Sequence, residues 1–118
     1  MTLKDYQTLC VQSEPKHLTR GEEALLGLMG LNAAAGTALG MYHKTLFEGV
    51  ELPQEGLLET LGEAIRHIAI VAHAADIELV EVLRQDAASL KLSNGSESTE
   101  NGDYEKLEVK DVQKEETV

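Results

Sequence analysis

The chain contains few aromatic residues, one cysteine and two prolines. There is one phenylalanine, three tyrosines and no tryptophan among 118 residues, so aliphatic and alanine side chains must supply most of the core. Cys10 has no second cysteine to pair with, which excludes an intrachain disulfide and a multi-cysteine metal site. Abundant Ala, Leu and Glu favour an all-helical domain over a sheet protein.

Neither a signal peptide nor a membrane-spanning segment is expected. Residues 1–6 lack an apolar signal core, and the apolar stretches read as far shorter than the roughly 20 residues that cross a bilayer. With a single cysteine, a reducing cytoplasm is the expected compartment. The sequence also contains no Gly-rich phosphate loop and no Ser/His/Asp arrangement that would support nucleophilic catalysis.

The charge of the chain is strongly acidic. Residues 1–92 hold 13 acidic and 7 basic residues, and residues 93–118 hold 8 and 3. Both parts would repel a nucleic-acid backbone, so a polynucleotide is not an expected partner. An acidic surface is compatible with a basic protein partner, with divalent cations, or simply with solvation.

The hydrophobic pattern divides the chain into a helical domain, 1–92, and an acidic tail, 93–118, whose Gly/Ser-rich start is typical of disorder. We expect helices from residue 3 to about 13, and over 21–45, 53–75 and 79–90. Thr2 is a candidate cap for the first helix, and Thr19 with Glu22 forms a capping-box pattern before the second. The small residues of 32–38 would let another helix approach closely, while 47–52 reads as a loop.

Five segments occur in the order and spacing of a known family. They are LKDYQ at 3–7, EALLGLMGL at 23–31, HK with LFEGVEL at 43–52, LETLGEAI at 58–65, and IELVEV at 77–82. This set resembles the small phage and bacterial MazG-like proteins, which are all-α nucleoside triphosphate pyrophosphohydrolases. The resemblance implies a four-helix bundle that associates as a dimer or a dimer of dimers, and a phage origin would fit it.

The family pattern implies a magnesium site made of two carboxylate pairs on facing helices. Residues three apart share a helix face, so such pairs can enclose a hard cation. In this chain the first pair falls at Ala34 and Thr37, and the second at Thr60 and Glu63. The formal charge of the four positions therefore drops from −4 to −1. We consider three interpretations: a degraded site, an ordinary helical bundle, or a working site built from other residues.

Other residues offer partial replacements. Glu59 and Glu63 are candidate metal ligands, and a Glu63/His67 pair with His43 is a candidate transition-metal site. Arg66 is a candidate ion-pair partner for Glu59 and Glu63, placing a positive charge where magnesium would sit. The resemblance also implies nucleotide contacts at Lys44 and Asp86, although either is equally a surface charge.

These observations lead to three functional hypotheses. The first is a MazG-like protein with little or no pyrophosphohydrolase activity, which binds a nucleotide or, through its acidic surface or tail, a protein. The second is an active, Mg²⁺-dependent enzyme that converts (d)NTPs to (d)NMP and pyrophosphate using Glu59, Glu63 and Asp86. The third is a structural oligomerisation domain. In every case we expect a homodimer or homotetramer and no membrane partner.

Overall fold

The computed structural model describes residues 1–94, which form four α-helices and no strand. The helices are α1 (Leu3–Gln12), α2 (Arg20–Glu48), α3 (Gln54–Ala74) and α4 (Leu79–Ser93). The predicted all-α class is therefore confirmed for the described part of the chain. Residues 95–118 lie outside it, and so does most of the predicted tail.

Local capping explains where the first two helices begin. The Thr2 hydroxyl accepts from the Asp5 amide at 3.0 Å, and the Asp5 carboxylate accepts from the Thr2 amide at 3.2 Å. Thr19 and Glu22 make the same reciprocal pair at 3.1 and 2.9 Å. Each box satisfies two amides at the helix start, which have no partner in the helix itself.

The ends of α2 and α3 differ slightly from the prediction. Helix α2 continues past residue 45 through Glu48, so the prediction that a loop begins at 47 is wrong by two residues. The helix ends at Gly49, which adopts the left-handed conformation (φ 73°) that glycine takes without a Cβ penalty. Pro53 is the residue before α3 and not part of its first turn. The predicted break near 76–78 is confirmed, with Asp76 at φ 61°.

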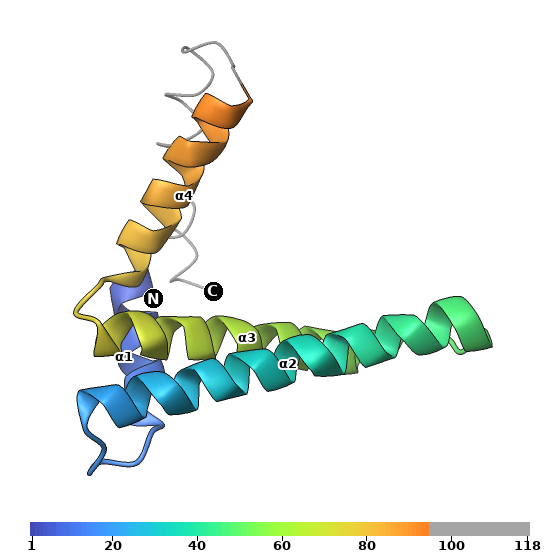
Figure 1. Cartoon of the computed structure of the whole chain (residues 1–118), viewed down its shortest axis with the longest axis horizontal. Helices are drawn as coiled ribbons and strands as arrows, with labels where there is room; N and C mark the ends of the chain where they lie inside the picture. The colour runs from blue at the N-terminus through green and yellow to red at the C-terminus, as the bar shows by residue number, and fades with distance from the viewer. Residues whose placement is uncertain (95–118) are drawn as a thin grey trace.

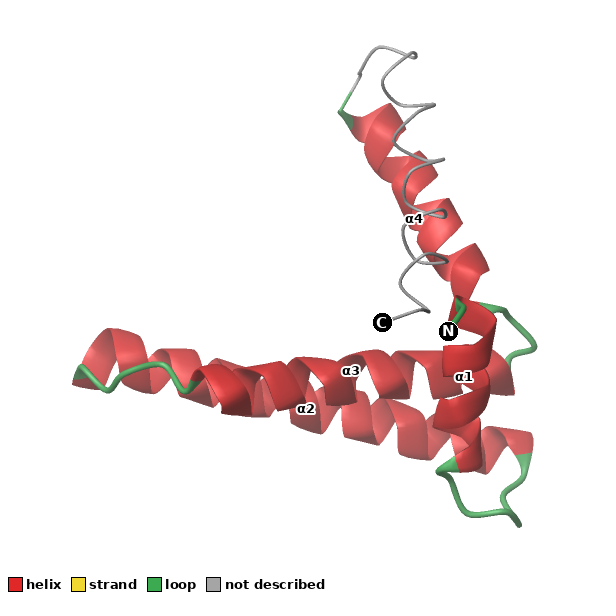
Figure 2. Ribbon diagram, turned by 180° about the vertical axis from the view of Figure 1, so that it is seen from behind, coloured by secondary structure: helices red, strands yellow, loops and turns green. Residues whose placement is uncertain are grey.

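The four helices are arranged as a long hairpin with the two shorter helices at one end. Helices α2 and α3 run side by side as an antiparallel hairpin, and α1 lies across one end of it, against α3 (Figure 1). Helix α4 contacts α1 and α3 only at its beginning and then projects away from the hairpin (Figure 2). The order of two long helices with one shorter helix before them and one after them matches the predicted ranges. The four helices do not close a bundle within one chain, however.

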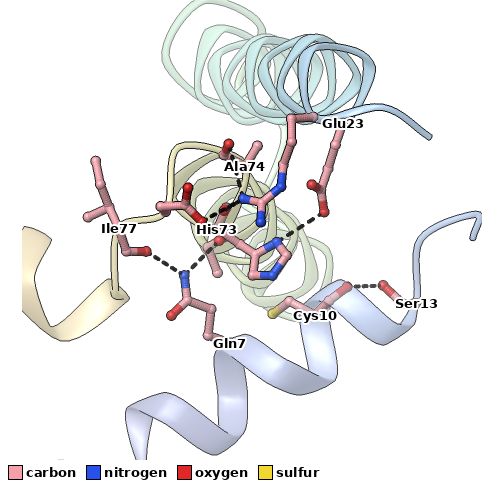
Figure 3. A network of polar contacts seen from close by, with 10 residues as sticks. Gln7, Cys10, Ser13, Glu23, His73, Ala74 and Ile77 are labelled. Carbon is pink, nitrogen blue, oxygen red and sulfur yellow. Dashed lines mark hydrogen bonds and ion pairs between the residues drawn. The ribbon is translucent and has the colours of Figure 1, made fainter.

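The small core lies where α1, α3 and the start of α4 meet. It contains Cys10, Ala69, Ile70 and Leu79, with Leu3, Tyr6 and Ile68 packed against it. The buried Gln7 amide joins these elements: its nitrogen donates to the carbonyls of Ala69 (3.1 Å) and Ile77 (3.0 Å), as Figure 3 shows. Its oxygen accepts from the Leu79 amide at 3.0 Å. Gln7 thus fixes α1 to the connection between α3 and α4.

Two glycines of α2 allow α3 to approach closely. A Cβ at Gly27 would lie 2.7 Å from a methyl group of Val71, and a Cβ at Gly30 would collide with the imidazole of His67. The 32–38 run, which was expected to provide this contact, contributes mainly Ala34, which is 4% exposed. Gly36 has no neighbour within 4 Å of its Cβ position.

Candidate functional site

The four positions of the expected metal motif divide into two buried and two exposed residues. Ala34 and Thr60 are 4% and 6% exposed, within the hairpin. The Thr60 hydroxyl donates to the Gly56 carbonyl one turn earlier, at 2.8 Å. Thr37 and Glu63 are exposed. Two of the four positions therefore serve helix packing, and Glu63 alone keeps a carboxylate.

The carboxylates that remain near the expected motif do not form a metal-binding group in the described part of the chain. Glu59 and Glu63 are both exposed on α3. Among residues 1–94, no group of three or more His, Cys, Asp or Glu side chains is placed to hold a metal ion. Mg²⁺ takes octahedral oxygen ligands, usually several waters together with carboxylates and substrate phosphates, and the family pattern supplies four carboxylates where this chain has one. Within one chain, the residues at these positions do not fit the family's magnesium site.

The histidines are also separated, which corrects the alternative metal site. The His67 ring packs over Gly30, while the His43 ring contacts Phe47 with centroids 4.9 Å apart. Gly30 and His43 are 13 residues apart on α2, or about 20 Å along a helix. His43 and His67 therefore lie at different levels of the hairpin and cannot share a metal with Glu63.

Arg66 does not form the expected ion pairs with Glu59 or Glu63 in the described part of the chain. It lies instead near α1, where its positive charge acts on Tyr6 and Cys10. Burial nevertheless dominates there and raises the pKa of Tyr6 to about 12. Burial likewise raises the pKa of the Cys10 thiol, so Cys10 is a packing residue and not an activated nucleophile.

An open groove at the turn of the hairpin brings two predicted site residues together. It has a volume of about 430 Å³ and is lined by Thr37, Gly40, Met41, Lys44, Val50, Glu51 and Pro53. The loop folds back on the helix here, and the Val50 amide donates to the Lys44 carbonyl at 3.3 Å. The exposed Lys44 gives the groove a positive charge, which the Glu51 carboxylate opposes.

Asp86 is not part of this groove. It is exposed on α4, which leaves the hairpin at the end opposite the groove (Figure 1). Helix α3, with 21 residues, separates the two ends by about 30 Å. Lys44 and Asp86, which the resemblance separately implies as nucleotide contacts, therefore lie near opposite ends of the hairpin in a single chain.

A polar cluster that the sequence analysis did not single out joins the start of α2 to the end of α3. His73 Nδ1 lies 3.3 Å from a carboxylate oxygen of Glu23, whose side chain is only 11% exposed. Arg20 donates at 2.8 Å to both the His73 carbonyl and the Asp76 carboxylate (Figure 3). The sequence gives only a weak signal for this cluster, because Arg20 and His73 are 53 positions apart and charged residues are common near helix ends. The cluster acts as a clasp between α2 and α3 at the end of the hairpin opposite its turn.

Helix α2 is unusually apolar. Residues 24–42 are 19 consecutive residues without an Asp, Glu, Lys or Arg, so the expectation of only short apolar stretches is wrong. In the described chain, α2 is the one helix long and apolar enough to cross a membrane, by length and composition alone. Core helices of soluble proteins pass the same criterion, but here only 11% of the apolar segment is buried. Most of the apolar segment of α2 is therefore exposed in the single chain.

In comparisons with known proteins, no family model matches the chain, and neither a curated protein nor a solved structure is significantly similar to it. The class that the fold defines is an all-α protein built on a long helical hairpin. The MazG-like family remains a prediction.

Proposed function

We propose that this chain is a MazG-like helical scaffold that has lost its metal-dependent chemistry and acts as a binding module. Its candidate ligand is a nucleotide, held at the groove beside Lys44. The observation that carries the proposal is the burial of Ala34 and Thr60 in the hairpin, at positions where the family pattern requires carboxylates. Packing has replaced metal binding there, while Thr37 and Lys44 still line one accessible groove.

The charges of the groove support a weak interaction with phosphate. One lysine ammonium attracts a phosphate, and Glu51 in the same groove reduces that attraction. A divalent ion carried by the nucleotide would relieve the repulsion from the acidic chain, because triphosphates bring their own magnesium ligands. We therefore expect a nucleotide to bind more strongly with Mg²⁺ present than with a chelator.

Thermal unfolding with a panel of nucleotides tests the proposal. A ligand at ten times its Kd stabilises a folded protein by about 1.4 kcal/mol, which raises the Tm of a small domain by several degrees. We expect such a rise for at least one nucleoside triphosphate, and its loss in Lys44→Ala. Lys16→Ala is the matched control, because Lys16 lies in the loop before α2 and is exposed. A shift that survives Lys44→Ala would contradict the proposed site.

The acidic surface supports a second candidate, a basic protein partner. The described domain carries most of the acidic residues, including the exposed Glu59 and Glu63. Pulldowns that compare the full chain with residues 1–94 separate the domain from the rest of the chain. Recovery of the same partner by both would assign the interaction to the helical domain, and recovery by the full chain alone would assign it to the tail.

A further inference from the structure

The groove at the turn of the hairpin contains two opposite charges that do not pair with each other. Lys44 and Glu51 both line this groove, and both are exposed. Within residues 1–94, neither the Lys44 ammonium group nor the Glu51 carboxylate forms a hydrogen bond or an ion pair. Both groups are therefore available to a ligand, and a molecule with a negative end and a hydrogen-bond donor end can satisfy both.

The turn sets the position of the Glu51 backbone relative to Lys44. Gly49 ends α2 in the left-handed conformation, and the Val50 amide donates to the Lys44 carbonyl at 3.3 Å. A hydrogen bond across six residues is a common way for a helix to end, and here its acceptor is Lys44 itself. Glu51 follows directly after this bond, so the main chain holds it at the groove before any ligand binds. Such preorganisation reduces the entropy that binding costs.

Apolar groups form much of the remaining lining. The Met41 methyl group and the Pro53 ring converge beside α3, because a Cβ at Gly56 would lie 3.3 Å from Met41 Cε and 3.7 Å from Pro53 Cβ. A Cβ at Gly40, which also lines the groove, would have no neighbour within 4 Å, so no side chain fills this part. A flat aromatic ring can rest on such a surface, since a methionine thioether makes favourable contacts with aromatic rings.

A carboxylate beside a nucleobase discriminates between the bases by their donors. An ionised carboxylate only accepts hydrogen bonds, through two oxygens. Guanine presents two adjacent donors on its pairing edge, N1–H and the N2 amino group, which match those two oxygens. In adenine and cytosine the amino donor has a ring-nitrogen acceptor beside it, and the N3–H of uracil lies between two carbonyl acceptors. Each of these acceptors would face a carboxylate oxygen without a proton between them, which disfavours the pairing.

We propose that the Lys44 groove selects a guanine nucleotide, with Glu51 binding N1–H and the N2 amino group and Lys44 binding the phosphates. The selection rests on the proposed nucleotide site and names the residue that determines its specificity. The carboxylate that weakens phosphate binding in the groove thereby acquires a role at the other end of the ligand. The apolar lining near Met41 and Pro53 supports the base between these two ends.

Titration calorimetry of the full chain with GTP, ITP, ATP, CTP and UTP, in the presence of Mg²⁺, measures the selection. We expect GTP to bind about tenfold more tightly than ATP, CTP or UTP, as for a bidentate contact to one base. ITP lacks the N2 amino group and should fall between GTP and ATP, whereas dGTP should bind as GTP does. Equal affinity for all bases would overturn the proposal. So would a uniform preference for ribonucleotides over deoxynucleotides, which would place Glu51 on the ribose hydroxyls.

Glu51→Gln tests the assigned contact. A carboxamide offers one acceptor and one donor, which complement the N6 amino group and N1 of adenine. The variant should lose about tenfold in affinity for GTP and should bind ATP more tightly than the wild type does. Glu48→Gln is the matched control, because Glu48 is exposed at the end of α2 and does not line the groove; it should retain the wild-type order. A guanine preference that survives Glu51→Gln would overturn the proposal.

Lys44→Ala separates failure of the selection from failure of the nucleotide site. Binding that is lost in Lys44→Ala but shows no preference among the bases would support the nucleotide site and overturn only the guanine selection. Absence of binding for every nucleotide would overturn both.

Discussion

The imidazole of His67 occupies the space that a side chain at Gly30 would need. This contact sets how closely α2 and α3 approach near the middle of the hairpin. It also places His67 beside Gly30, about 20 Å along α2 from His43. The Nδ1 atom of His67 is buried and has no hydrogen-bond partner among residues 1–94. His67 therefore acts as a packing residue whose position depends on a missing Cβ on the opposite helix.

We predict that Gly30→Ala destabilises the fold by about 1–3 kcal/mol, because the added methyl group must displace the imidazole or separate the helices. Gly62→Ala is the matched control. Gly62 lies within α3 with no atom within 4 Å of its Cβ position, so alanine should stabilise the helix by up to about 1 kcal/mol. Urea unfolding measures both, and equal effects would contradict the packing assigned to His67.

Gln7→Leu should be strongly destabilising. The change removes one acceptor and one donor group, leaving the Leu79 amide and the carbonyls of Ala69 and Ile77 without their partner. An unsatisfied buried polar group costs about 1–3 kcal/mol, so we expect a loss of about 3 kcal/mol. Gln12→Leu, at the exposed end of α1, should change stability by less than about 0.5 kcal/mol. Chemical denaturation of the two variants gives the comparison.

The raised pKa of Tyr6 predicts a loss of stability in alkaline solution. Burial favours the neutral phenol and raises its pKa from 10.0 to about 12 in the folded chain, with Cys10 adding to the shift and Arg66 opposing it. The stabilising contribution is thus complete below pH 10 and falls as the pH rises toward 12. Tyr6→Phe should remove this part of the pH dependence. An ultraviolet titration in which every tyrosine ionises near pH 10 would disprove it.

The sequence predicted features that depend on neighbouring residues and missed those that depend on distant ones. The capping boxes at Thr2 and Thr19 were predictable because each hydrogen bond joins residues three positions apart. The clasp between Glu23 and His73, by contrast, joins residues 50 positions apart, and no local pattern marks it. Likewise, the direction of α4 depends on the contacts of Gln7 with the α3–α4 connection.

The candidate site shows the same division. Ala34, Thr37 and Thr60 could be assigned to the motif by spacing, but their burial could not be known before α2 and α3 were placed together. Lys44 and Thr37 share a groove because they lie seven residues apart on one helix face. Asp86 could be assigned to the site only from its position in the sequence, and it lies on a helix that leaves from the other end of the hairpin.

The central claim is that packing has replaced metal chemistry in this hairpin. Pyrophosphate release from a nucleoside triphosphate panel, with Mg²⁺ and with a chelator, tests it most directly. We predict no release above the protein-free rate for any nucleotide, with or without Mg²⁺. Mg²⁺-dependent release that disappears in Glu63→Ala, while Glu78→Ala at the exposed residue before α4 retains it, would show that Glu63 still serves an active metal site and would contradict the account.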